Sequence, residues 1–326
     1  MKLGLIGLGL ALAAASLSAD FVHNEFQAFT QQYDRVYSRQ EFPVRYQIFR
    51  ENLEKIIQHN QEGHSYTLGI NEFADWTFEE FTAKRLMAPQ NCSATGGANL
   101  RLPDPYLPEF VNWTARGVVQ EVKNQMHCGD CWAFSTIGTL EAHWALYTHQ
   151  PPLNLSEQQL VDCAGNFNNF GCNGGLPSQA FEYIHYAGGV TSEEEYPYTA
   201  LDGTCRTDLP LYASVPFGSA NITYQDEDEL AAAVAYIGPV SIAFQVLPDF
   251  MHYSGGVYNN VTCSNSPANV NHAVVAVGYD ASNPDSQYWI VKNSWGAAWG
   301  LQGYFWIQKG SNRCGLADCA SFPLLG

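Results

Sequence analysis

The sequence predicts an α+β protein with a helical half, an antiparallel sheet half and a cleft where the two halves meet. Two observations predict this class. After Cys131 an apolar run at helical spacing extends from Trp132 to Tyr147, and Ser156 begins a second helix with a capping pattern. From Val240 onward the chain consists of short β-branched and aromatic runs separated by Gly and Pro turns. Two such halves pack around a shared groove, where ligands usually bind.

Composition supports a packed protein and limits its partners. The 326 residues are 46% hydrophobic and 13% aromatic, which is ample for a core. Thirty-two acidic residues against 15 basic ones give a formal charge of −17. Nucleic acids and anionic membranes need a basic face, so we expect neither as a partner.

Residues 1–19 have the pattern of a secretory signal peptide. They start with a basic residue, continue with a short apolar run and end in small residues before Asp20. The apolar run ends too early to cross a bilayer. We therefore expect a soluble protein of the secretory pathway, destined for the lysosome or the extracellular space.

Secretion implies an oxidising compartment, where nine cysteines suggest four disulfides and one thiol left over. We expect Cys131 to be the free one, whereas the pairing of the others does not follow from the residues alone. Five Asn-X-Ser/Thr sequons are candidate glycosylation sites: Asn91, Asn112, Asn154, Asn221 and Asn260.

The N-terminal third predicts a long helix. Between Glu41 and Asn60, six residues recur at intervals of four, four, three, four and four, which places them on one stripe of a helix. Periodicity alone indicates only an ordinary amphipathic helix. The stretch from Gly96 to Pro108 is rich in Gly, Pro and Asn and predicts an exposed linker suited to proteolytic processing.

The C-terminal half predicts strands. A Gly-rich turn at 171–175 lies before the point, at Val240, where the composition changes from helical to strand-like. Four apolar runs after that point are expected strands: Val240–Val246, Ala273–Tyr279, Tyr288–Lys292 and Gly303–Gln308.

Three residues suit one catalytic arrangement. Cys131 stands at the expected start of a helix, His272 follows 141 residues later, and Asn293 follows 162 residues after Cys131. A helix N-terminus and an imidazolium both favour a nucleophilic thiolate. Asn293 could fix the tautomer of His272, and Trp295 could shield that hydrogen bond from water.

Metal-binding, redox and purely structural roles for the cysteines and the histidine have weaker support. Cys128 and Cys131 lack the further ligands of a zinc site and the βαβ context of a redox pair. A lone histidine is more often a structural core residue, but the expected partner Asn293 favours a catalytic role for His272. We expect no metal and no cofactor.

The segments around Cys131, His272 and Asn293 resemble the papain and cathepsin family of cysteine peptidases. The resemblance covers residues from about Phe21 to Gly326. It implies a papain-like two-lobed fold in which a helical propeptide (20–106), acting as an intramolecular inhibitor, precedes a mature peptidase domain (107–326). The helix stripe and the motif at 69–75 match the propeptide motifs of cathepsin L-like and H-like enzymes.

The resemblance also implies roles for single residues. Gln125 is the side-chain donor to the oxyanion, and Gly174 and Gly175 pair with the substrate backbone. Leu176 and Pro177 lie beside the S2 pocket. The implied disulfides are Cys128–Cys172, Cys163–Cys205 and Cys263–Cys314. Peptides, proteins and cystatin-type inhibitors are the expected partners of a monomeric enzyme.

Residues 88–95 resemble the mini-chain of cathepsin H-like enzymes, a piece of the propeptide that stays tethered by a disulfide. Cys92 and Cys319 are therefore expected to pair. After processing, the free carboxylate of Thr95 would attract the protonated amino terminus of a peptide and favour aminopeptidase over endopeptidase activity.

The chain departs from the family pattern at three positions. Asp130 stands where the family usually has Ser, Met126 where it usually has Gly, and Ala88 where the mini-chain has an acidic residue. Since Asp often begins helices, we expect Asp130 to be a solvent-facing cap. The alternatives are a cathepsin L-like endopeptidase, a catalytically inert inhibitor or binding protein, and, more remotely, a disulfide oxidoreductase.

Overall fold

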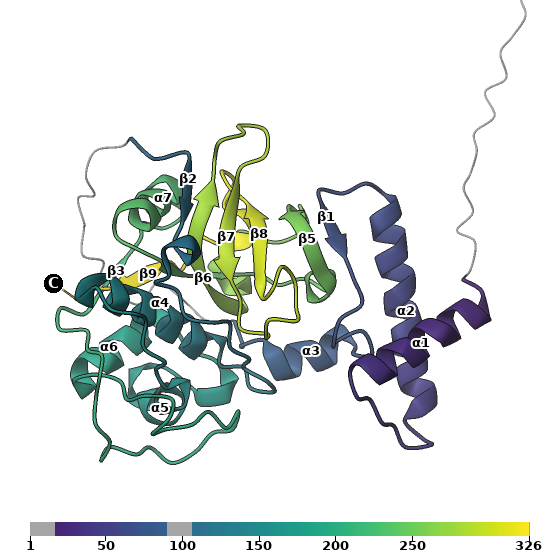
Figure 1. Ribbon diagram of the computed structural model, residues 1–326, viewed down its shortest axis with the longest axis horizontal. Coiled ribbons are helices and arrows are strands. Elements are labelled where there is room, and N and C mark those ends of the chain that lie inside the picture. Colours follow the sequence, from purple (N-terminus) through teal and green to yellow (C-terminus); the bar gives the residue numbers. More distant parts are fainter. Residues whose placement is uncertain (1–16, 90–105, 326) are drawn as a thin grey trace, which may run out of the picture.

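A propeptide-like helical unit, a central sheet and a second group of helices lie side by side (Figure 1). The computed structural model describes residues 17–89 and 106–325. The first unit contains α1 (Ala19–Gln32) and α2 (Phe42–Gln61), followed by α3 (Phe78–Arg85). The helix predicted for 41–60 is thus confirmed. No helix among the described residues is long and apolar enough to span a membrane.

Aromatic packing and buried amides hold the N-terminal unit together. Phe26 of α1 meets Phe49 of α2 with ring centroids 5.2 Å apart, and both side chains are buried. The buried Asn52 amide donates to the carbonyl oxygens of Ala74 and Trp76, at 3.0 and 2.9 Å. The second predicted motif is therefore bound directly to the helix stripe.

The helical lobe is built around α4 (Cys131–Thr148), with α5 (Glu157–Cys163) and α6 (Pro177–Ala187) beside it. α4 is buried on nearly all sides, as expected for a helix that is apolar around its whole circumference. The predicted cap of α5 is present, because the Ser156 hydroxyl accepts the N–H of Gln159 at 3.1 Å. α7 (Glu227–Tyr236) covers the sheet on the other side. Short 3₁₀ turns occupy Thr114–Arg116, Ala164–Phe167, Gly171–Asn173, Phe250–His252, Pro267–Asn269 and Arg313–Gly315.

Nine strands among the described residues form the sheet, in the order β1-β5-β8-β7-β6-β4-β9-β3, with β2 beside β6. Their bounds are β1 Tyr66–Leu68, β2 Phe110–Asn112, β3 Ser219–Asn221, β4 Val240–Phe244, β5 Tyr253–Tyr258, β6 His272–Asp280, β7 Tyr288–Lys292, β8 Tyr304–Gln308 and β9 Ser321–Pro323. All four predicted strands are present. The predicted antiparallel sheet holds except where β5 runs parallel to β8.

The strand β1 belongs to the N-terminal unit yet pairs with β5 of the sheet lobe (Figure 1). Tyr66 lies opposite Gly256, and the Tyr66 hydroxyl donates to Asp249 at 2.6 Å. The N-terminal unit thereby closes an open edge of the sheet.

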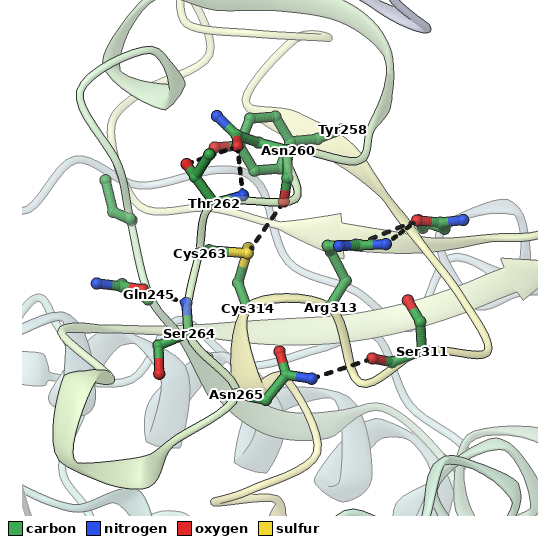
Figure 2. The surroundings of a disulfide bond; sticks show 12 residues. Gln245, Tyr258, Asn260, Thr262, Cys263, Ser264, Asn265, Ser311, Arg313 and Cys314 are labelled. Atoms are coloured by element: carbon green, nitrogen blue, oxygen red, sulfur yellow. Dashed lines mark hydrogen bonds between the residues drawn. A yellow bond between two sulfur atoms is a disulfide. The ribbon is translucent and has the colours of Figure 1, made fainter.

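Three disulfides join described cysteines, and they are the three pairs that the family resemblance implies: Cys128–Cys172, Cys163–Cys205 and Cys263–Cys314. Figure 2 shows Cys263–Cys314 beside Asn260 and Thr262. The side-chain oxygen of Asn260 accepts the N–H of Thr262 at 2.9 Å, while its amide nitrogen donates to Asp249 at 2.9 Å. A glycan on that nitrogen would leave it a single hydrogen with which to keep the bond to Asp249. Of the other sequons, Asn154 is exposed, Asn112 and Asn221 are partly buried, and Asn91 lies outside the described residues.

Replacing Glu227 by alanine should destabilise the sheet lobe by about 3 kcal/mol. The buried Glu227 carboxylate accepts the indole N–H of Trp289 and the N–H of Gly310, both at 2.9 Å, and the N–H of Asn312. The variant leaves these donors without a partner. Urea unfolding of the full chain measures the effect, and Asp228→Ala at the exposed neighbouring position should lower the unfolding free energy by less than about 1 kcal/mol. Equal losses in both variants would contradict this anchoring role.

Candidate active site

The expected nucleophile, Cys131, is the first residue of α4. It is the only free cysteine among the described residues, and it is fully buried. Its sulfur accepts the N–H of Ala273 at 3.3 Å, so the start of α4 touches the start of β6. Burial raises the pKa of the Cys131 thiol to about 12, against the lowering effect of the Ala273 N–H. The thiol is therefore neutral in this state.

His272 is the first residue of β6 and is bonded to Asn293, which follows β7. The Nε2 atom of His272 lies 2.8 Å from Oδ1 of Asn293, which also accepts the N–H of Ser294 at 2.8 Å. Because a carbonyl oxygen only accepts, Nε2 carries the proton. The indole of Trp295 stacks on the imidazole with centroids 4.6 Å apart and covers this bond, as the sequence predicts.

The second nitrogen of His272, Nδ1, has no hydrogen-bond partner among the described residues. Burial lowers the pKa of His272 to about 4. Neither group carries a charge in this state, and the thiolate–imidazolium pair remains a prediction for a state in which water reaches the cleft.

Gln125 is fully buried beside this pair. Its amide nitrogen donates to the carbonyl oxygens of Arg85 and Cys128, both at 2.9 Å, while its amide oxygen accepts the hydroxyl of Ser294 at 2.7 Å. Arg85 ends α3, so a peptide carbonyl of the N-terminal unit occupies the donor that the resemblance assigns to the oxyanion.

The segment Arg85–Ala88 lies between the two lobes. The Met87 N–H donates to Asn271 of the sheet lobe at 3.0 Å, and the Ala88 N–H donates to Asn173 of the helical lobe at 3.4 Å. Leu86 and Met87 are buried. The segment thus closes the cleft over the sulfur of Cys131, and the Met87 N–H also lowers the pKa of that thiol.

Two aromatic residues of the N-terminal unit cover Trp295 from outside. Phe81 of α3 meets the indole edge-on at 5.0 Å, and Phe73 does so at 6.2 Å. Arg85 lies over the Phe73 ring at 4.9 Å, and its guanidinium donates to Asn124 at 2.8 Å. Burial lowers the pKa of Arg85 to about 10.

The predicted substrate-binding residues lie on the helical lobe. A Cβ atom on Gly175 would come within 2.7 Å of the Trp132 ring, and Gly174 has a φ of 119°. Both positions therefore favour glycine. The chain then enters α6 through Leu176 and Pro177, which are buried. Gly174 directly follows Asn173, which holds the N–H of Ala88.

The predicted mini-chain falls almost wholly outside the described residues, which exclude Asn91, Cys92 and Thr95. Its expected anchor, Cys319, is disulfide-bonded and partly buried. The predicted linker of residues 96–108 also lies mostly outside the described ranges.

The expectation for Asp130 is wrong. Asp130 is fully buried rather than solvent-facing, and its side chain caps no helix N–H. Instead, its Oδ2 atom is hydrogen-bonded to the hydroxyl of Tyr198 at 2.7 Å. A tertiary partner 68 residues away outweighs the local preference of Asp for a helix start. Met126 is half exposed, with a φ of 50°, which explains why glycine suits this position.

A buried cluster of charged side chains near the site was not predicted from the sequence. The Lys123 ammonium donates to Glu141 at 3.0 Å, to Glu157 at 2.8 Å and to the Leu155 oxygen at 2.9 Å. Lys123 thereby fixes the strand-like segment that leads to Gln125. An apolar helix interrupted by one Glu, here α4 at Glu141, is the only sequence signal for it. No group of three His, Cys, Asp or Glu side chains in the described ranges could hold a metal ion.

Residues 107–324 match the family described as papain family cysteine protease, and residues 26–81 match the cathepsin propeptide inhibitor domain (I29). The chain is 52% identical to pro-cathepsin H of Medicago truncatula, over 92% of this chain and 85% of that protein. It is 48% identical to pro-cathepsin H of Bos taurus, over 96% and 94%. The solved structure of a recombinant stem bromelain precursor superposes with a TM-score of 0.85 at 36% identity, covering 94% of this chain and 99% of that one.

Proposed function

The chain belongs to the papain family of cysteine proteases and carries that family's propeptide inhibitor domain, and we propose that Cys131 and His272 are its catalytic pair. Once the propeptide has left the cleft, water reaches both groups and the thiolate–imidazolium form becomes favourable. The free thiol at the start of α4, beside a histidine held by Asn293 and covered by Trp295, is the observation that carries this proposal.

Each step of peptide hydrolysis has a residue to serve it. The sulfur of Cys131 attacks the scissile carbonyl, and His272 gives its proton to the leaving amine, which leaves an acyl-enzyme. Water then attacks the thioester with His272 as the base. Gln125 and the backbone N–H of Cys131 stabilise the oxyanion in both steps. The bond from Gln125 to the Arg85 carbonyl supports this role, because the amide already donates to a peptide oxygen.

The proposed zymogen consists of three consecutive parts. Residues 1–19 are the signal peptide, 20–106 the inhibitory propeptide and 107–326 the mature peptidase. The hydrogen bonds of Arg85, Met87 and Ala88 across the cleft support a propeptide that inhibits by occupying the place of the substrate. The mature enzyme is a monomer of the lysosome or the extracellular space, open to cystatin-type inhibitors.

Within this class the enzyme is mainly an aminopeptidase. A mini-chain of residues 88–95, tethered through Cys92 to Cys319, fills the non-primed side of the cleft. Its terminal carboxylate on Thr95 then selects the free amino terminus of the substrate. The disulfide-bonded state of Cys319 and the identity to two pro-cathepsins H support this specificity.

The processed enzyme should cleave an aminoacyl amide with a free amine at least about tenfold faster than its N-acetylated twin. Opposite charges about 4 Å apart near a surface are worth up to roughly 4 kcal/mol before desolvation, which is enough for this preference. In a Cys319→Ser variant, which cannot hold the tether, the preference should disappear while endopeptidase activity rises. Equal kcat/KM values for the twin substrates in the wild-type enzyme would instead identify a cathepsin L-like endopeptidase.

A further inference from the structure

A carboxylic acid without access to solvent precedes the nucleophile. Asp130 is fully buried, and its Oδ1 atom has no hydrogen-bond partner among the described residues. Its Oδ2 atom has one side-chain partner, the hydroxyl of Tyr198 at 2.7 Å. A buried carboxylate normally needs several donors, so this environment suits the neutral acid better than the anion.

The two acceptors of the Tyr198 hydroxyl favour a protonated Asp130. Its oxygen is 2.7 Å from Oδ2 of Asp130 and 2.8 Å from the backbone oxygen of Gln125. A phenol has one proton and can donate it to one of these two acceptors. With an ionised Asp130, one of the two short oxygen–oxygen contacts would contain no proton and would be repulsive. A protonated Asp130 removes this conflict, because it donates to Tyr198, which then donates to Gln125.

The charged groups around Asp130 mostly oppose its ionisation. Burial has the largest effect and raises the pKa of Asp130. The hydrogen bonds from Tyr198 and from the backbone N–H of Asp130 itself lower it, and the charges of Glu157 of α5 and Asp202 raise it. Arg85, which belongs to the proposed propeptide, interacts with Asp130 electrostatically, since Asp130 raises the pKa of Arg85. Removal of the propeptide therefore takes away a cation that favours the anion.

We propose that Asp130 is a positioning residue that acts as a neutral acid, linking Tyr198 to the backbone of Gln125, and that its ionisation sets the alkaline limit of catalysis. This inference rests on the proposed peptidase function. As a neutral acid, Asp130 fixes the loop that carries the oxyanion amide and places no charge beside Cys131. As an anion it would break the link to Gln125 and oppose the thiolate, since its charge raises the pKa of Cys131.

The direction of the pH effect follows from the raised pKa of Asp130. Below that pKa the acid is neutral and the link is intact, so activity is retained. As the pH rises through it, kcat/KM should fall before the imidazolium of His272 loses its proton. The Asp130→Asn variant cannot ionise, and its amide can still donate to Tyr198. Asp130→Ser likewise cannot ionise.

The test compares pH profiles of the processed wild-type enzyme and these two variants. The ratio of kcat/KM at about pH 8 to that at about pH 5.5 should be about tenfold higher in D130N, and D130S should shift it in the same direction. Glu194→Gln, which neutralises an exposed carboxylate in the segment before Tyr198, should leave the ratio as in the wild type. An unchanged ratio in both Asp130 variants would overturn the proposal even if their overall rates fall.

A second measurement needs neither a variant nor activity. In the full-length wild-type chain labelled with ¹³C at the aspartate carboxyl carbons, NMR should show one carboxyl that stays protonated above about pH 6. If all aspartates titrate in the ordinary range, the neutral acid does not exist and the proposal fails. An enzyme that cleaves no peptide but retains this protonated carboxyl would instead contradict the proposed function alone.

Discussion

Replacing Cys131 by alanine should abolish peptide hydrolysis, with kcat/KM at least about 10³-fold below that of the wild-type enzyme. No other cysteine in the described part of the chain is free, so no second thiol can form the acyl-enzyme. The loss should appear for free-amine and N-acetylated substrates alike, because exopeptidase and endopeptidase activity both need the thiol of Cys131. Turnover of a fluorogenic aminoacyl amide measures it.

Two histidines provide a matched comparison for the second member of the pair. His272 and His252 are both buried, and burial lowers the pKa of each, to about 4 and about 3. Only His272 is bonded to Asn293 beside the nucleophile. His272→Ala should therefore lose about as much activity as the cysteine variant, whereas His252→Ala should keep kcat/KM within about tenfold. Substantial activity in the Cys131→Ala protein would refute the covalent mechanism.

Structural features that depend on residues close together in the chain were predictable from the sequence. The interval pattern of α2 comes from one helix face that bonds to the segment 68–80, for example through Asn52 and Asn60, and Ser156 caps its own helix. The strand β7 is bounded by Tyr288 and Lys292, as the β-branched and aromatic run predicts. The site residues were predictable for a different reason. Cys131, His272 and Asn293 carry motifs whose spacing matches a known family, and the fold then brings them together.

Features that depend on distant partners were not predictable. β5 contains two adjacent glycines and lacks a strand-like composition, and it forms because β1 and β8 supply its hydrogen bonds from both sides. The burial of Asp130 depends on Tyr198, and the bond from Gln125 to Arg85 spans 40 residues. Such contacts have no periodicity in the sequence, so only the folded chain reveals that the Arg85 carbonyl occupies the amide of Gln125, the proposed oxyanion donor.

Replacing Phe73 by alanine should loosen the propeptide and expose the active site of the intact zymogen. Phe73 is fully buried, and its ring meets those of Phe81 at 5.0 Å, Trp76 at 5.5 Å and Trp295 at 6.2 Å. Loss of a buried Phe side chain removes about 3–5 kcal/mol. Phe81 and Trp76 belong to the proposed propeptide and Trp295 to the proposed mature domain, so the loss weakens both the packing of the propeptide and its contact with the peptidase.

A loss of about 3 kcal/mol in the free energy that keeps the folded propeptide on the peptidase corresponds to roughly a 100-fold larger open population. Because Cys131 is covered by the segment Arg85–Ala88, its alkylation by iodoacetamide reports that population. The initial labelling rate of the unprocessed chain, followed by intact mass near neutral pH, should therefore rise about 100-fold in Phe73→Ala. Phe21→Ala, at an exposed position of α1, should label like the wild type. A wild-type rate in Phe73→Ala would mean that the hydrogen bonds of the cleft segment close the site without the aromatic anchor.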